Sequence, residues 1–145
     1  MNTLDKQKEL IEILVNKINE HTNDKVEVIN INDYTEERKD HMISVGISSM
    51  APFHEENPML PDYNITVDIL VDSFIANDRY GHQFEQNKNE LLNYLEPYFQ
   101  NPGRLDEIFE DIPVCAFFLQ NIDNSTTEES NICRITIQLI ASFPI

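Results

Sequence analysis

The sequence predicts an α+β fold, namely a mainly antiparallel sheet of about five strands with two main helices packed on one face. Three observations carry this prediction. The length of 145 residues suits one domain that spans residues 1–145. Two segments place apolar residues at the spacing of a helix, and several others alternate apolar with polar residues. The strand-like segments follow one another mostly in pairs, which favours antiparallel neighbours over βαβ units.

The first helix is predicted over residues 4–21. Its apolar residues recur three and four positions apart, with lysine and glutamate between them. These residues are Leu10, Ile11, Leu14, Val15 and Ile18. The polar run at residues 21–24 ends the pattern, and Val26, Val28 and Ile31 then suggest a short first strand. Residues 34–40 are charged and predict a connection.

Two strands are predicted next, on either side of a long loop. Ile43, Val45 and Ile47 alternate with small residues, and the same alternation recurs over residues 65–71. Residues 50–62 carry three prolines. Because proline removes a ladder donor and fixes φ, this segment is predicted to be the loop that joins the two strands.

The second half of the chain predicts a helix followed by a hairpin. Apolar positions fall on one helical face over residues 79–99, and residues 105–112 suggest a further helical turn. Residues 114–122 are apolar enough for a central strand, and residues 133–143 alternate as the last one. The polar residues 123–131 are predicted to form the hairpin loop.

Charge excludes several kinds of partner. The chain has 26 acidic and 10 basic residues, a net charge of −16, and residues 40–145 hold 17 acids against four bases. Repulsion on this scale keeps phosphate backbones and anionic lipids away, so we expect neither direct nucleic-acid binding nor a membrane partner. No run approaches the roughly 20 apolar residues of a membrane-spanning helix, and the first residues are unlike a signal sequence, which predicts synthesis in a cytoplasm.

The two cysteines are too few for a disulfide framework or a four-ligand zinc site. In a reducing compartment Cys115 and Cys133 are expected to be small core residues. The predicted hairpin brings them close across its ladder, which leaves a disulfide between them as the alternative.

Three clusters contain groups that can do chemistry, and each has a simpler interpretation. His54, Glu55 and Glu56 are possible ligands for a transition metal, but their spacing is not that of HExxH, and a solvated loop is favoured. Asp78, Arg79 and His82 combine an acid, a base and a proton carrier, yet Asn77 or Asp78 has the position of a helix N-cap.

The third cluster is a run of four acids in residues 106–111 that suits a hard cation such as calcium, or a solvated surface. Its members are Asp106, Glu107, Glu110 and Asp111. The sequence contains no glycine-rich phosphate loop, G-x-S-x-G elbow or CxxC pair. We therefore expect no catalytic residue, no cofactor and no metal ligand.

Apolar residues on the proline-rich loop predict a contact with another protein. Phe53, Met59 and Leu60 lie among the prolines, and apolar side chains on a loop tip often bury themselves in a partner. The alternative is that the loop folds back on its own domain.

Three parts of the chain carry a resemblance to a known family. The amphipathic helix at residues 4–21 precedes paired strands, the acidic alternating strand at residues 63–72 leads into the helix at residues 79–99, and a hairpin closes at residues 134–143. This order resembles the tail-terminator and tail-completion proteins of long-tailed bacteriophages and their prophages. Residues 30–40, with a short strand and a charged connection, have no clear counterpart in the family's pattern.

The resemblance implies a non-enzymatic subunit that forms a ring, commonly a hexamer, and joins tail-tube or neck proteins in the virion after synthesis in the bacterial cytoplasm. In such a ring, acids lining the lumen would let DNA slide past. Two alternatives from other classes stay open. One is an acidic binding or inhibitory module, such as a DNA mimic, and the other is a small enzyme that uses Asp78, His82 or the acidic run.

Overall fold

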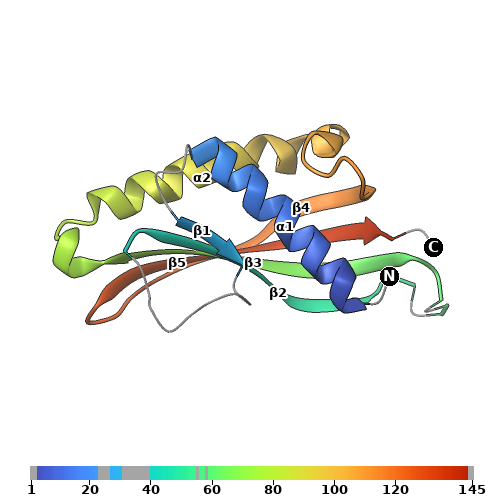
Figure 1. The fold of residues 1–145 in the computed structure, drawn as a ribbon, viewed down its shortest axis with the longest axis horizontal. Helices are drawn as coiled ribbons and strands as arrows, with labels where there is room; N and C mark the ends of the chain where they lie inside the picture. The colour runs from blue at the N-terminus through green and yellow to red at the C-terminus, as the bar shows by residue number, and fades with distance from the viewer. Residues whose placement is uncertain (1–2, 23–26, 31–39, 55, 58, 144–145) are drawn as a thin grey trace.

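The computed structural model describes residues 3–22, 27–30, 40–54, 56–57 and 59–143. The sheet has five strands in the order β1-β2-β3-β5-β4, with β1 parallel to β2 and the other neighbours antiparallel. The helices α1 and α2 both lie over one face of this sheet (Figure 1). The elements are α1 (Thr3–Thr22), β1 (Glu27–Asn30), β2 (Met42–Pro52), β3 (Asp62–Phe74), the 3-10 helix η2 (Ile75–Asn77), α2 (His82–Gln100), the 3-10 helix η3 (Pro102–Glu107), β4 (Val114–Thr126) and β5 (Ser130–Ser142). The predicted α+β class is confirmed.

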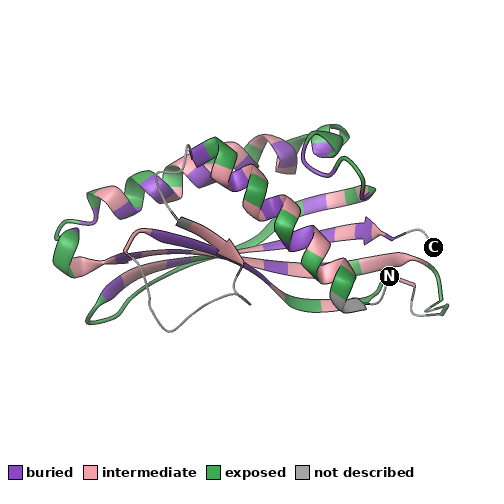
Figure 2. Ribbon diagram, viewed as in Figure 1, coloured by how far each residue is buried: buried purple, intermediate pink, exposed green. Residues whose placement is uncertain are grey.

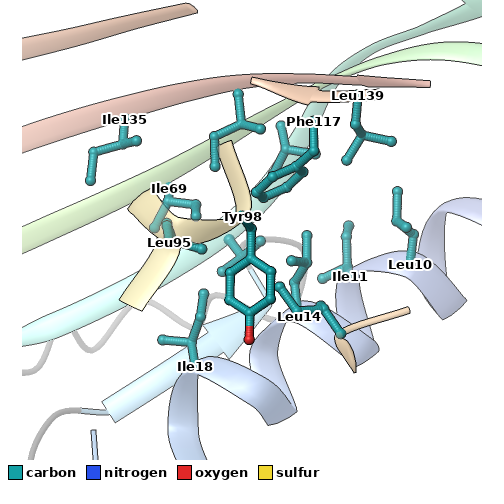
Figure 3. Packing of buried hydrophobic residues seen from close by; sticks show 14 of the residues in the cluster. Leu10, Ile11, Leu14, Ile18, Ile69, Leu95, Tyr98, Phe117, Ile135 and Leu139 are labelled. Atoms are coloured by element: carbon teal, nitrogen blue, oxygen red, sulfur yellow. The ribbon is translucent and has the colours of Figure 1, made fainter. Parts of the chain in front are cut away.

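The core lies between the helices and the sheet. In β3 and β5 every second side chain is buried under the helices, which is the alternation that the sequence predicts. Figure 3 shows Tyr98 of α2 pointing toward Leu14 and Ile18 of α1, with Leu95 of α2 beside the sheet residue Ile69. The apolar stripes of both helices thus face one shared core.

The segment after α2 completes this core. Leu105 in η3 is buried, as are Ile108, Phe109 and Ile112 after it, in agreement with the apolar positions of the predicted extra helical turn. Phe109 and Phe99 both pack against Phe117 of β4, with ring centroids 6.0 and 5.1 Å away respectively. This aromatic group holds η3 and the end of α2 over the start of β4.

The proline-rich loop is shorter than predicted, because β2 continues to Pro52. The amide of Phe53 donates to Asp62 O at 2.9 Å, so the backbone nitrogen of Pro52, one residue earlier, points away from β3. On that side β1 pairs only with residues 42–45 of β2. The missing N–H of Pro52 therefore costs no hydrogen bond to β3, and the strand tolerates proline there.

The strand predicted as central lies at the edge. β4 is 13 residues long and pairs only with β5 among the described strands, and most of its residues are exposed. The predicted loop at residues 123–131 is also too long, since β4 runs to Thr126 and β5 begins at Ser130. Polar residues in the hairpin reflect solvent exposure of an edge strand and of its turn.

The cysteines lie far apart. Cys133 is buried and pairs with Asn124, nine positions along β4 from Cys115, which corresponds to about 30 Å. Cys115 is exposed, next to a bulge in β4. Both thiols are free, so the alternative of a disulfide between them is wrong, and the predicted core position holds for Cys133 alone.

Candidate functional site

A cluster of polar side chains joins the start of β2 to the end of β3. Asp40 Oδ1 accepts hydrogen bonds from the amides of Phe74 at 2.8 Å and His41 at 3.0 Å, and Oδ2 accepts one from Asn77 Nδ2 at 2.9 Å. His41 Nδ1 lies 2.9 Å from Ser73 Oγ, and its Nε2 lies 3.5 Å from Asp40 Oδ2. The sequence analysis singled out none of these contacts.

The surroundings of Asp40 favour its charged form. Partial burial raises the pKa of the carboxyl, but the hydrogen bonds from the Phe74 amide and the Asn77 side chain, together with nearby His41, lower it more. The net pKa lies below its ordinary value. Asp40 therefore remains a strong acceptor at neutral pH.

Asp40 contacts His41, which in turn contacts Ser73, and these three residue types are also those of a hydrolytic triad. The serine decides against that role, because Ser73 is only 1% exposed and lies within β3, where a substrate carbonyl cannot reach its hydroxyl. The backbone of His41 is left-handed, with φ of 55°, which is what turns its ring toward Ser73. The cluster fixes the end of the β2–β3 pair.

Asp78 does not occupy the N-cap position predicted for Asn77 or Asp78, because the N-cap residue of α2 is Gly81, but its carboxylate caps amides in the first turn of the helix. Its Oδ1 accepts a hydrogen bond from the amide of Gln83 at 3.2 Å and its Oδ2 from that of Phe84 at 2.9 Å. Both amides lie in the first turn of α2, where no carbonyl of the helix can reach them. Arg79 and His82, which the sequence analysis grouped with Asp78, make other contacts: Arg79 lies over the ring of Tyr80, and His82 is exposed. The structure does not bring these three groups into one pocket.

The acidic run is divided among separate contacts. Glu107 accepts a hydrogen bond from Arg104 Nε at 2.6 Å, which lowers the pKa of the carboxyl, and Glu110 lies 4.0 Å from Lys17 Nζ. Asp106, Glu110 and Asp111 line a surface hollow of about 360 Å³ next to η3. Across the described ranges, no three His, Cys, Asp or Glu side chains are grouped as a metal site requires.

The loop between β2 and β3 holds its backbone in place and leaves its apolar side chains outside. His54 Nε2 lies 2.7 Å from Asp62 Oδ2, and the amide of Leu60 donates to Asn57 O at 3.2 Å. Phe53, Met59 and Leu60 are between 39% and 82% exposed, and we call them the loop patch. Figure 2 shows exposed positions in the described part of this loop. They do not fold back into the core. Glu55, a predicted companion of His54, lies outside the described residues.

A second exposed apolar surface follows the outer strand. Phe118, Leu119 and Ile122 of β4 are between 38% and 48% exposed, and we call them the edge patch. Phe118 lies opposite Gln138 on the face away from the helices, whereas Leu119 and Ile122 lie opposite Ile137 and Ile135 on the helix side. The sequence analysis missed this surface because it predicted a central strand, in which these side chains are buried.

The two patches lie toward opposite edges of the sheet. β4 ends the strand order on one side, and β2, which leads into the loop patch, is next to last on the other. Beyond Val45, β2 has only β3 as a neighbour within the part of the chain that the structure describes. The protein thus has two separate apolar surfaces that remain exposed in the part of the chain that the structure describes.

Several polar and charged side chains of β3 and β5 lie on the face of the sheet away from the helices. Asp62, Asp68 and Asp72 alternate with buried residues along β3, and Thr136 Oγ1 donates to Asp68 Oδ1 at 2.9 Å. Arg134 and Asp123 lie opposite each other in the β4–β5 register. This face therefore contributes to the acidic surface of the protein.

No helix among the described residues is long and apolar enough to cross a membrane. Comparison with models of known protein families gives no match, and comparison with curated proteins gives none either.

Proposed function

We propose that this protein is a non-enzymatic structural subunit that assembles with copies of itself into a ring. The observation that carries the proposal is the pair of exposed apolar patches toward opposite edges of the sheet. Exposed apolar groups gathered in this way are typical of protein–protein contacts. Two different surfaces on one subunit suit a head-to-tail contact, and such contacts generate rings when the rotation closes.

The negative charge of the chain limits which surfaces of two copies can come into contact. Copies with a net charge of −16 repel one another over most orientations. Within the 13 residues of β4, Asp123 is the one charged residue, and it lies opposite Arg134. Copies therefore meet with less repulsion at this edge than at the acidic face of the sheet.

We further propose that the ring is a tail terminator or head–tail joining subunit of a long-tailed bacteriophage, located in the virion. This finer assignment is supported by the order of the segments, which resembles that family, and by the acidic surface. A hexameric ring with acids toward its lumen would let DNA pass without adhering. Tail-tube or neck proteins would then be its partners.

The test is the mass of the native particle over a range of concentrations, by analytical ultracentrifugation or native mass spectrometry. We expect the monomer at low concentration and a closed ring at high concentration or on addition of tail-tube protein. A strict monomer in every condition, with and without tail-tube protein, would rule out the assembly role. A ring that ignores tail-tube and neck proteins would retain assembly but refute the phage assignment.

A second candidate is an acidic module that occupies a basic groove of another protein. The aspartates of β3 on the face away from the helices favour it, since Asp62, Asp68 and Asp72 place three half-buried negative charges along one strand. A pull-down that returns one basic protein, and that loses it at high salt, would support this function. Retention of that protein at high salt would exclude a mainly electrostatic contact.

A further inference from the structure

We propose that the loop patch of one copy docks on the edge patch of the next copy. This inference rests on the proposed self-assembly and specifies which residues form the contact. The loop patch is Phe53, Met59 and Leu60, and the edge patch is Phe118, Leu119 and Ile122. One repeated contact then covers both apolar surfaces of every subunit.

The arrangement of strands dictates that the contact joins different copies. The loop patch follows β2 and the edge patch lies on β4, with β3 and β5 between these strands. A contact between identical patches around a two-fold axis would cover one patch and leave the other exposed. A head-to-tail contact leaves neither exposed in a closed ring, so it accounts for both surfaces at once.

The two ends of the loop are anchored by hydrogen bonds. The amide of Phe53 donates to Asp62 O at 2.9 Å, the His54 ring lies 2.7 Å from the Asp62 carboxylate, and the amide of Phe143 donates to Pro61 O at 2.9 Å. These contacts hold both ends of the loop on the sheet. Phe53 and Leu60, which lie at or next to these anchored ends, then lose less conformational entropy on burial than they would in an unanchored loop.

The outer strand offers both side chains and backbone to the incoming loop. Phe118 projects from one face of β4, and Leu119 and Ile122 project from the other, so the edge patch surrounds the free side of the strand. Backbone groups on that side have no neighbouring strand among the described residues. Arg134 is exposed and lies opposite Asp123, so the acidic loop that contains Glu56 meets less repulsion at this edge than on the rest of the acidic surface.

The experiment uses two double variants of the whole chain. Phe53→Ser with Leu60→Ser removes the loop patch, and Phe118→Ser with Ile122→Ser removes the edge patch. Because every substituted side chain is exposed in the monomer, circular dichroism and thermal unfolding should show folded proteins. Each variant alone should be monomeric at concentrations at least about tenfold above those at which the wild type assembles.

The decisive step is to mix the two variants. The first retains its edge patch and the second retains its loop patch, so one productive contact is possible between them and none at either end of the pair. We expect a one-to-one complex of twice the subunit mass and no larger species. Tyr80→Ser is the matched control, because Tyr80 is exposed but belongs to neither patch, and it should assemble like the wild type.

The outcomes separate this inference from the proposed function. A wild type that never assembles overturns both. A wild type that assembles while the mixed variants stay monomeric, or while either variant alone still forms the full ring, overturns the head-to-tail contact and leaves the assembly role standing.

Discussion

Replacing Asp78 by alanine tests how much the capping carboxylate stabilises the fold. The substitution leaves the amides of Gln83 and Phe84 without their acceptor in the first turn of α2. Loss of a capping side chain costs about 0.5–2 kcal/mol. Asp78 is nearly buried and accepts two bonds with a charged group, so we expect the upper end, about 2 kcal/mol. For a chain of this length that corresponds to a fall in Tm of about 6–8 °C.

The assay is urea unfolding followed by circular dichroism, with Asp78→Asn as the control. Asparagine retains one acceptor oxygen and is itself a good cap, so it should cost less than about half as much as alanine. Equal losses for both variants, or a loss below about 0.5 kcal/mol for alanine, would refute the capping role. Glu85→Ala, in the same turn, removes only an ion pair with Lys88 at 3.0 Å and should cost less than about 1 kcal/mol.

Three further predictions follow from the core, the polar cluster and the thiols. Leu95→Ala should lower the free energy of unfolding by about 2–5 kcal/mol because it leaves a cavity in the core, whereas Leu119→Ala should cost less than about 1 kcal/mol; equal losses in urea unfolding would contradict the edge position of β4. The pKa of Asp40 is lowered by folding, so its contribution is present above the unfolded value near 3.8 and is lost as pH falls through the folded value. Asp40→Asn should therefore lose less stability than the wild type between about pH 5 and pH 2, and parallel pH curves would count against it. A thiol reagent should label Cys115 in the native protein and Cys133 only after unfolding, since burial raises the pKa of the Cys133 thiol; rapid double labelling by mass spectrometry would disagree.

Local sequence patterns predict the helices and strands of this fold better than they predict which strands lie next to each other. Residues 65–71 alternate so regularly that β3 follows from the sequence alone, and the spacing of Leu10, Leu14 and Ile18 predicts the buried side of α1. The order of strands in the sheet depends on contacts between distant segments, and no local pattern encodes it. Residues 114–122 are apolar in either position, so the sequence could not distinguish a central strand from the edge strand that β4 is.

Some candidate sites could likewise be predicted from local sequence, whereas others depend on contacts between distant segments. Phe53, Met59 and Leu60 were predicted to contact another protein because prolines around them indicated a loop; the structure finds them exposed, and the contact itself stays a prediction. The edge patch required knowledge of the sheet order. The hydrogen bond between His41 and Ser73 joins residues 32 positions apart, and neither residue type signals the other. Only the pairing of β2 with β3 brings them together.

The position of β5 has a consequence for synthesis of the chain. β5 comes after every other described strand in the sequence, yet it lies between β3 and β4 and pairs with 13 residues of β3. A nascent chain that still holds β5 inside the ribosome has no partner for β4 and lacks one neighbour for β3. Folding of the sheet must then wait until β5 emerges, and its pairing across more than 50 residues favours slow, non-local assembly.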